Sequence, residues 1–360
     1  MIYELEFLGL NQETKDADAA CFRYYNNLQQ RPIVGIYDGG LKVHGKALRE
    51  HLNKYYFDNT PDPIIDYVIC SHSDQDHASG LTEILENFRV KTLIMNRPWM
   101  YVNELFPSLS DKRITKASLK ERLRENYPYI CELESLANKK GTIIQDGFQG
   151  TRIGNHLTIL SPSREFYLQC IVESSKTPFK GKDGTLSSSI IDSIAKTFES
   201  WTNELIRENV KTSPENESSI IVLGDMGEEK FLLTGDSGIQ ALTAAADYAE
   251  KNICSLTKVN VQQIPHHGGR HNVSPSVLNR ILGSIVPSNT IPTRTAIVSV
   301  GLGSDHPRKM VTNAYIRRGF NVYEARDKTL LHYYGNISNR EGWGPANPSK
   351  FSQQVEEWND

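Results

Sequence analysis

Two histidines and two aspartates stand within six residues of one another in the run His72-Ser-Asp-Gln-Asp-His77. The apolar run Tyr67-Val-Ile-Cys70 before them predicts a buried strand, and residues 81–88 after them predict a helix. Ligands on a short loop between a strand and a helix can converge on one point while both elements stay intact. Imidazole nitrogen and carboxylate oxygen together suit zinc, manganese or iron(II). The loop therefore predicts a metal site with the candidate ligands His72, Asp74, Asp76 and His77; the alternative is a polar loop with a histidine-rich helix cap.

A second pair of histidines follows another predicted strand. Residues 258–264 read as a strand that ends in Pro265-His-His-Gly-Gly269. Two histidines at a strand end, before two glycines, again suit a metal ligand on a loop. Neighbouring residues on an extended strand point to opposite sides. We therefore expect either His266 or His267 to be a ligand, and the other to contact substrate or a bound water.

The elements that must position these residues are strands and helices in alternation. Helices are predicted at 46–55, 81–88, 238–251 and 308–318, and residues 97–140 are expected to be mostly helical. Strands are predicted at 2–9, 20–25, 32–37, 67–70, 90–95, 142–145, 157–160, 216–224, 230–236, 258–264, 295–301, 321–324 and 329–334. Each candidate motif falls where one of these strands ends.

The loop from His72 to His77 resembles the metal-binding loop of the metallo-β-lactamase fold, usually His-x-His-x-Asp-His, with Asp74 in place of the second histidine. This variant resembles in particular the metallo-β-lactamase-like domain of bacterial competence DNA-internalisation (ComEC-type) proteins. The other motifs in family order are Asp38, Asp236, His266-His267 and His306. The resemblance implies the α/β class and an αββα metallo-β-lactamase-like sandwich, with two mixed β-sheets flanked by helices and the metal at one edge.

The resemblance also implies roles for these residues. The family aspartate at the position of Asp38 lies behind the metal loop and holds it by hydrogen bonds. Asp236 ends the run Thr234-Gly-Asp, where the family aspartate reaches both metal positions and bridges them. His267 is favoured over His266 as the ligand because the family's ligand sits next to the glycine. For both aspartates a plain turn is the alternative.

His306 belongs to the last of these motifs. The run Ser299-Val-Gly followed by Asp305-His-Pro resembles the closing motif of the competence-type branch. Pro307 suits the first turn of a helix, so we expect His306 at a helix N-terminus, where backbone N–H groups favour an anionic phosphate oxygen. A simple helix cap is the alternative.

The chain departs from the wider fold at one ligand. The fold normally supplies a third histidine just after a strand that ends near a proline, and here residues 159–163 read Ile-Leu-Ser-Pro-Ser. One metal position is therefore expected to have fewer protein ligands. We expect one or two divalent ions, Zn²⁺ or Mn²⁺, as cofactors.

The ligand set implies hydrolysis by metal-bound hydroxide, because a metal ion lowers the pKa of its bound water. Asp76 would hold or orient that water, and His306 would neutralise a developing anion or protonate the leaving group. The ComEC-type resemblance implies a phosphodiesterase or nuclease. Two alternatives stay open: a hydrolase of a small ester, thioester, lactone or cyclic phosphodiester, and a catalytically decayed metal-binding or interaction module.

Composition limits the partners and the compartment. The 360 residues carry a net charge of −3, so no global basic field favours tight, nonspecific binding to duplex nucleic acid. A local basic groove for nucleic acid or a nucleotide stays possible. The five cysteines form no Cys-x-x-Cys pair, which indicates reduced thiols. With no signal peptide and no apolar stretch of about 18 residues, we expect a cytoplasmic protein without a membrane segment.

We expect one hydrolase domain at residues 1–335, with a mainly helical insertion at 164–218 and a C-terminal tail at 336–360. Apolar residues recur with helical spacing over 187–209. That helix could cover the active-site mouth, make a dimer contact or pack on the domain's own surface. The loop before it, residues 174–184, is basic and could approach an anionic substrate or be solvated; its lysines are Lys176, Lys180 and Lys182.

Overall fold

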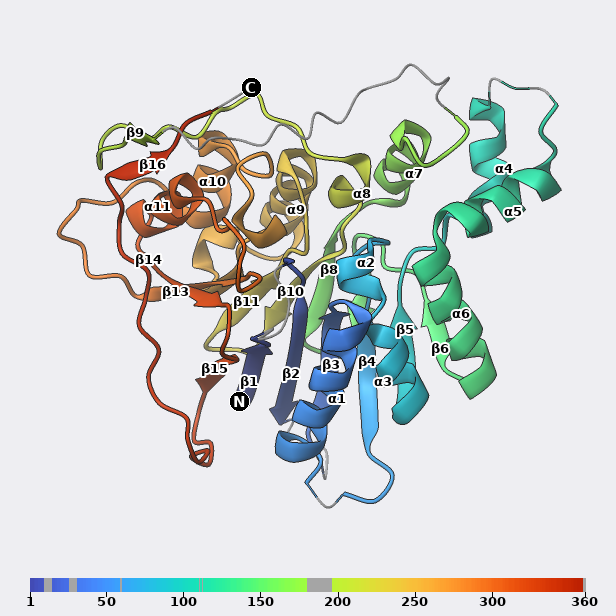
Figure 1. The fold of residues 1–360 in the computed structure, drawn as a ribbon, viewed down its shortest axis with the longest axis horizontal. Coiled ribbons are helices and arrows are strands. Elements are labelled where there is room, and N and C mark those ends of the chain that lie inside the picture. Colours follow the sequence, from blue (N-terminus) through green and yellow to red (C-terminus); the bar gives the residue numbers. More distant parts are fainter. Residues whose placement is uncertain are drawn as a thin grey trace.

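Two seven-stranded β-sheets pack against each other, and helices cover their outer faces (Figure 1). The structure, a computed structural model, describes residues 1–9, 15–25, 31–58, 60–109, 111, 113–179 and 196–358. Both sheets contain parallel and antiparallel pairs. The predicted αββα sandwich of two mixed sheets flanked by helices is thereby confirmed.

The first sheet has the strand order β15-β1-β2-β3-β4-β5-β6. Its strands are β1 (Ile2–Phe7), β2 (Ala19–Tyr25), β3 (Ile33–Gly39), β4 (Ile64–Ile69), β5 (Arg89–Ile94), β6 (Ile143–Gln145) and β15 (Leu330–Tyr334). The strands β3 to β6 run parallel, while β2 runs antiparallel to β3. The carboxyl ends of β3 and β4 and the start of β2 therefore meet at one edge.

The second sheet has the order β14-β13-β12-β11-β10-β8-β7. Its strands are β7 (Arg152–Ile153), β8 (Leu157–Ser161), β10 (Ile221–Asp225), β11 (Lys230–Leu233), β12 (Val261–Gln263), β13 (Arg294–Ser299) and β14 (Phe320–Ala325). The strands β11 to β14 are parallel neighbours. A separate two-stranded sheet pairs β9 (Lys196–Phe198) with β16 (Gln354–Glu356).

Helices on the two outer faces bury separate hydrophobic clusters. The α-helices are α1 (Lys42–Tyr55), α2 (Gln75–Ala78), α3 (Leu81–Asn87), α4 (Val102–Leu105), α5 (Lys116–Asn126), α6 (Pro128–Lys140), α7 (Arg164–Glu173), α8 (Pro214–Glu217), α9 (Ile239–Asn252), α10 (Pro275–Leu282) and α11 (Lys309–Arg317). Short 3₁₀ turns are η1 (Pro98–Tyr101), η2 (Phe106–Ser108), η3 (Leu256–Lys258) and η4 (His266–Gly268). Among the described residues, no helix is long and apolar enough to cross a membrane.

The core between the sheets follows from the two-residue period of the strands. Tyr3, Leu5 and Phe7 of β1 share one buried cluster with Phe231 and Leu233 of β11. Hydrogen bonds also join the sheets at the edge where the candidate motifs lie. The Ile220 N–H donates to the Ser71 carbonyl at 2.9 Å, and the Tyr37 hydroxyl donates to the Ile220 carbonyl at 2.7 Å. The loops that follow β4 and precede β10 are therefore held together.

The prediction of a helix over 187–209 is wrong for the part that the structure describes. Residues 196–198 form β9, and 199–213 are turns and irregular chain; 187–195, like Lys180 and Lys182, lie outside the described residues. The segment is instead tied down by side chains: Trp201 Nε1 donates to the Val286 carbonyl at 2.8 Å, and buried Arg317 lies 3.2 Å from Glu199. The expected dimer helix has no support in this segment.

The tail after residue 335 packs on the domain at two places. Arg340 pairs with Glu4 and lies 2.7 Å from Glu6, both carboxylates being buried. Further along, Arg270 donates to the Glu357 carbonyl at 2.5 Å and its guanidinium lies 4.5 Å from the Trp358 ring centroid. The end of the described chain therefore braces the loop that carries His266 and His267.

Replacing Arg340 with alanine should destabilise the protein, because Glu4 and Glu6 lose their shared cation and keep only Arg23 and His51, respectively. We expect a loss of about 1–3 kcal/mol in the free energy of unfolding, measured by urea denaturation. The control is Arg113→Ala, which removes an exposed pair with Asp111 and should leave stability unchanged. Equal effects in the two variants would contradict the anchoring role of Arg340.

Candidate metal centre

The loop after β4 presents its histidines inward and its aspartates outward. Helix α2 begins within the loop, with Asp74 at its N-cap position. The side chains of His72 and His77 are fully buried, whereas those of Asp74 and Asp76 are 30% and 33% exposed. The histidines therefore form the inner wall of the centre, and the two aspartates lie on its open side.

Asp38 holds this loop from behind. One carboxylate oxygen accepts the Ser71 N–H at 2.7 Å, and the other accepts the Ser71 hydroxyl at 2.6 Å and lies 2.8 Å from His77 Nδ1. Asp38 adopts a left-handed backbone (φ 60°), which is costly for a residue other than glycine. The bond to Nδ1 sets the tautomer and leaves His77 Nε2 facing the centre.

Three imidazoles present the same nitrogen to the centre. His72 Nδ1 lies 2.9 Å from the Ser71 hydroxyl, and His267 Nδ1 donates to the Ser299 carbonyl at 2.9 Å. Because Nδ1 of each ring carries the proton of its hydrogen bond, the free lone pair lies on Nε2. The Nε2 atoms of His72, His77 and His267 are all buried and make no hydrogen bond. Each such group costs about 1–3 kcal/mol, a cost that a bound cation would remove.

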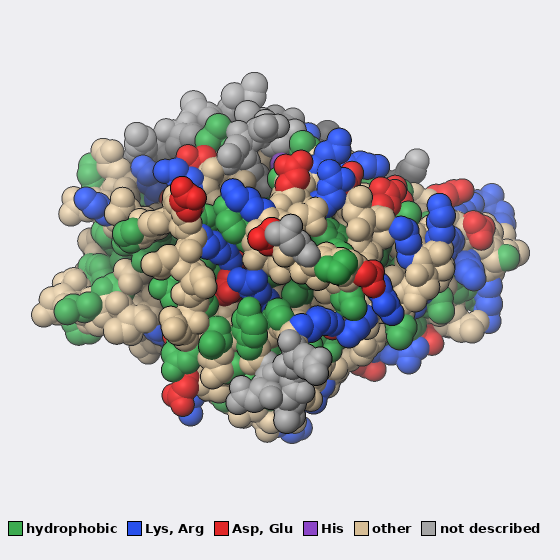
Figure 2. All heavy atoms as spheres, turned by 90° about the horizontal axis from the view of Figure 1, so that it is seen from below, with side chains coloured by type: hydrophobic (Ala, Val, Ile, Leu, Met, Phe, Trp, Pro, Cys, Tyr) green, Lys and Arg blue, Asp and Glu red, His purple; other side chains and the backbone are tan. Residues whose placement is uncertain are grey.

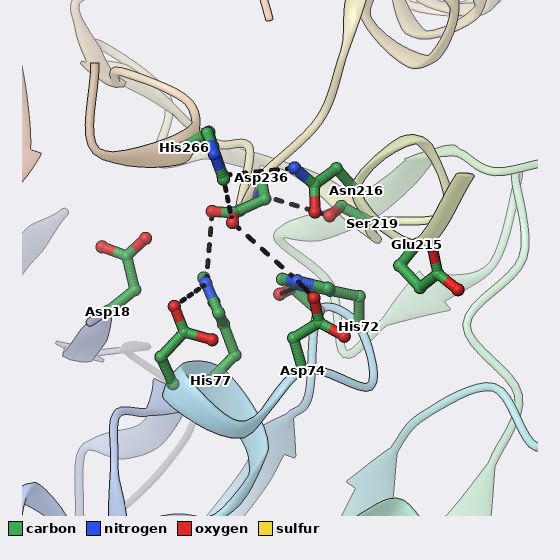
Figure 3. Close-up of polar contacts among 12 residues, drawn as sticks. Asp18, His72, Asp74, His77, Glu215, Asn216, Ser219, Asp236 and His266 are labelled. Carbon is green, nitrogen blue, oxygen red and sulfur yellow. Dashed lines mark hydrogen bonds and ion pairs between the residues drawn. The ribbon is translucent and has the colours of Figure 1, made fainter. Parts of the chain in front are cut away.

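Asp236 lies between His266 on one side and His72 and His77 on the other (Figure 3). Its Oδ1 lies 3.2 Å from His77 Nε2, whereas its Oδ2 lies 3.9 Å from His72 Nε2 and 2.5 Å from His266 Nδ1. Gly235 makes this approach possible: its φ is +52°, and a Cβ there would lie 2.9 Å from the Ser71 side chain. Oδ1 of the buried Asp236 carboxylate thus faces His77, and its Oδ2 faces His72 and His266.

Asp18 completes the cluster and was missed in the sequence. One ligand atom from each of Asp18, His77, Asp236 and His267 lies within 4.8 Å of all the others. Asp18 precedes β2, whose register pairs Ala19 with Gly39 of β3, so it arrives at the edge that carries Asp38. Its place next to a strand end was the only clue in the sequence; the antiparallel register that brings it to the site is a tertiary feature.

The histidine pair does not lie on extended backbone, so that expectation is wrong. Strand β12 ends at Gln263, and both His266 (φ 48°) and His267 (φ 54°) are left-handed within η4. The turn separates their roles. His267 is buried, with Nε2 3.6 Å from Asp76, whereas His266 is 34% exposed and bonds to Asp236. The geometry places His267 in the cluster and His266 at its rim.

The carboxylates of the cluster stabilise positive charge at its centre. Burial lowers the pKa of His77, but Asp236 and then Asp38 outweigh it and hold that pKa well above its usual range. Burial likewise opposes protonation of His267, but Asp18 and other neighbours raise its pKa to about 10. The same carboxylates would stabilise a divalent cation that takes the place of these protons.

His306 lies beside this cluster but not at a helix N-terminus, so that expectation is corrected. Helix α11 begins at Lys309, whose N–H donates to both oxygens of Glu356 at 3.0 Å. The tail carboxylate therefore occupies the helix end. His306 Nδ1 instead lies 2.8 Å from Asp16, and the His306 ring centroid is 6.4 Å from that of His266.

The donor set fits a divalent ion. The five buried atoms without a hydrogen bond at this centre are Asp18 Oδ2, His72 Nε2, His77 Nε2, Asp236 Oδ1 and His267 Nε2. Imidazole nitrogens with carboxylate oxygens are ligands for Zn²⁺, Mn²⁺ or Fe²⁺. Figure 3 shows that Asp18, the pair His72 and His77, and Asp236 come from segments far apart in the chain.

Removing metal should destabilise the folded protein, because the cluster would lose its counter-charge. Returning Zn²⁺ or Mn²⁺ at 100 times its dissociation constant should restore about 2.7 kcal/mol, measured as a rise in Tm of chelator-treated protein. The His267→Ala variant should lose most of this gain, and His271→Ala, an exposed neighbour on the same loop, should keep it. A gain equal to the wild type's in His267→Ala would contradict the cluster.

Residues 36–134 match the model of the metallo-beta-lactamase superfamily. Unliganded yeast PDE1 has a TM-score of 0.44 at 12% identity, over 92% of this chain and 99% of that chain. Tm1679, a metal-dependent hydrolase of the beta-lactamase superfamily, has a TM-score of 0.41 at 12% identity, over 94% and 100%. No curated protein sequence matches the chain.

The family match spans β4, the loop from His72 to His77 and the helices that follow. Residues 36–134 thus match the metallo-beta-lactamase superfamily model, and they lie within a chain whose two mixed sheets flanked by helices form an αββα sandwich.

Proposed function

We propose that the chain is a metal-dependent phosphodiesterase or nuclease, acting on nucleic acid or a nucleotide. The observation that carries this proposal is the buried cluster of Asp18, His77, Asp236 and His267, with His72 Nε2 on the other side of Asp236 and a second acid–base pair, His306 and Asp16, at its rim. The motif resemblance to ComEC-type domains supports a phosphodiester as the substrate. Asp18, His77, Asp236 and His267 would hold the ion, with His72, Asp74 and Asp76 beside them.

When bound, a divalent ion would act as a Lewis acid that polarises the phosphodiester and makes water acidic enough to attack at neutral pH. Asp76 is placed to orient that water: its carboxylate is one-third exposed and lies 3.9 Å from His77 Nε2 and 3.6 Å from His267 Nε2. Asp76 therefore faces both the ligands and the open side, from which a substrate must approach.

His306 is the proton donor in this proposal. Although burial opposes ionisation of Asp16, the hydrogen bond with His306 lowers the pKa of that carboxyl to about 2, so Asp16 stays charged. The Gly301 N–H and the Ser304 hydroxyl also donate to Asp16, each at 2.8 Å. Asp16 is thereby fixed and holds His306 Nδ1, which leaves the other ring nitrogen to pass a proton to the leaving oxygen.

The charge distribution favours a compact substrate or a single strand over a long duplex. Figure 2 shows basic and acidic side chains interspersed over one face, and the net charge is −3. A small cyclic phosphodiester, ester, thioester or lactone is the second candidate class for this reason. A decayed binding module is disfavoured, because the inward-facing nitrogens and the tautomers that expose them are intact.

Asp76→Ala and Asp236→Ala should each lower turnover about 100-fold or more while the fold stays intact. The assay is a panel of bis-p-nitrophenyl phosphate, single-stranded DNA and small esters, with Zn²⁺ or Mn²⁺. The control is Asp247→Ala, which removes an exposed partner of Arg280 on α9 and should keep full activity. Full activity in either site variant would exclude this site, and ester turnover without phosphodiester turnover would favour the second class.

His306→Ala should slow substrates with poor leaving groups far more than those with good ones. A nucleoside alkoxide needs a proton to leave, so its release should fall about 100-fold or more; p-nitrophenolate leaves without one and should fall little. Asp16→Asn should show the same pattern with a smaller loss in kcat and little change in KM. Equal losses for both leaving groups would show that His306 does not act as the acid.

A further inference from the structure

The two sides of the Asp236 carboxylate are not equivalent. On the Oδ1 side, every inward atom of Asp18, His77 and His267 is buried and without a hydrogen bond, as is Oδ1 itself. On the Oδ2 side, Oδ2 already bonds to His266 at 2.5 Å, and among the described residues His72 Nε2 is the buried imidazole nitrogen left there without a hydrogen bond. The first side presents a full ligand set, and the second a depleted one.

The second side also lacks a ligand from β8. Where the wider fold expects a third histidine, the strand ends at Ser161, followed by Pro162. The remaining candidate is Asp74, whose Oδ2 lies 3.9 Å from His72 Nε2. Its other oxygen is engaged: Lys176 Nζ lies 2.6 Å from Asp74 Oδ1. One carboxylate therefore spans the gap between His72 and a lysine ammonium.

Lys176 is held in this place by its own turn. The Lys176 N–H donates to the Ser174 hydroxyl at 3.0 Å. The Thr177 hydroxyl donates to the Ile171 carbonyl at 2.8 Å and the Ser174 carbonyl at 3.0 Å. Ser174 and Thr177 are buried on either side of Lys176, so the turn is anchored to the end of α7. The ammonium is presented to Asp74 from a fixed backbone.

We propose that the Lys176 ammonium takes the place of a second metal ion on the His72–Asp74 side, so that the centre holds one tightly bound divalent ion on Asp18, His77, Asp236 and His267. An exposed lysine–aspartate pair adds little to folding stability. Its charge still matters to a neighbouring cation, because two positive charges a few ångströms apart repel strongly near a protein surface. The inference rests on the metal centre of the proposed function and is independent of the substrate.

The test counts ions on the full chain without substrate. Chelator-treated protein is titrated with Mn²⁺, the free ion is followed by electron paramagnetic resonance, and bound metal is measured by elemental analysis. The wild type should retain one ion per chain. The Lys176→Met variant keeps the length of the side chain without its charge. Its affinity for a second ion should be at least about tenfold higher than that of the wild type. Lys176→Arg should behave as the wild type.

Two controls locate the effect. Lys91→Met removes another lysine–aspartate pair, 2.9 Å from Asp66 in β4, and should leave the count at one. His77→Ala should lose the tight ion, whereas His72→Ala should keep it. Two ions of similar affinity in the wild type, a Lys176→Met variant identical to the wild type, or loss of the tight ion in His72→Ala alone would each overturn the inference.

The outcome is separable from that of the proposed function. A chain that binds one ion, gains a second in Lys176→Met and cleaves no phosphodiester would support this inference and contradict the proposed substrate. A chain that cleaves phosphodiesters while holding two ions of similar affinity would do the reverse.

Discussion

The buried carboxylate of Asp236 is the group on which the rest of the centre depends. A carboxylate taken out of water is costly unless charge and hydrogen bonds replace the lost hydration. Here His77 and His266 lie against its two oxygens, and together they hold the pKa of Asp236 well below its usual range although burial opposes this. Asn272 donates to its backbone carbonyl at 2.8 Å. His77 comes from the segment after β4, whereas His266 and Asn272 come from the loop between β12 and α10, so one side chain requires two distant segments to converge.

Sheet topology makes that convergence possible. Parallel strands end on the same side, so the loops after β4, β11 and β12 reach one edge without long excursions. The two sheets are also joined there through Ser71 and Ile220. A shift of one residue in either register would turn the inward side chains outward, so the packing between the sheets and the geometry of the centre are determined together.

The centre has a rigid inner wall and a variable outer rim. On the inside, Asp38 and the Ser299 carbonyl fix the tautomers of His77 and His267, and the rings are buried. On the outside, Asp74 and Asp76 are partly exposed, and Asp74 pairs with Lys176. In the proposed centre, the inner wall would supply the ligands of the cation, and the rim would set the charge around it and the access to it.

The local sequence determined the strands, the histidine–aspartate loop and the strand ends at which Asp236 and the histidine pair lie, because hydrophobic periodicity and turn residues act over a few neighbouring positions. The fold and the main candidate residues could be predicted from it on that basis. Only the tertiary structure identified Asp18 and Asp16, placed Lys176 against Asp74 and Glu356 at the end of α11, and showed that residues 196–213 are not helical. These outcomes depend on strand register and on contacts between segments tens to hundreds of residues apart, and no local pattern records such contacts.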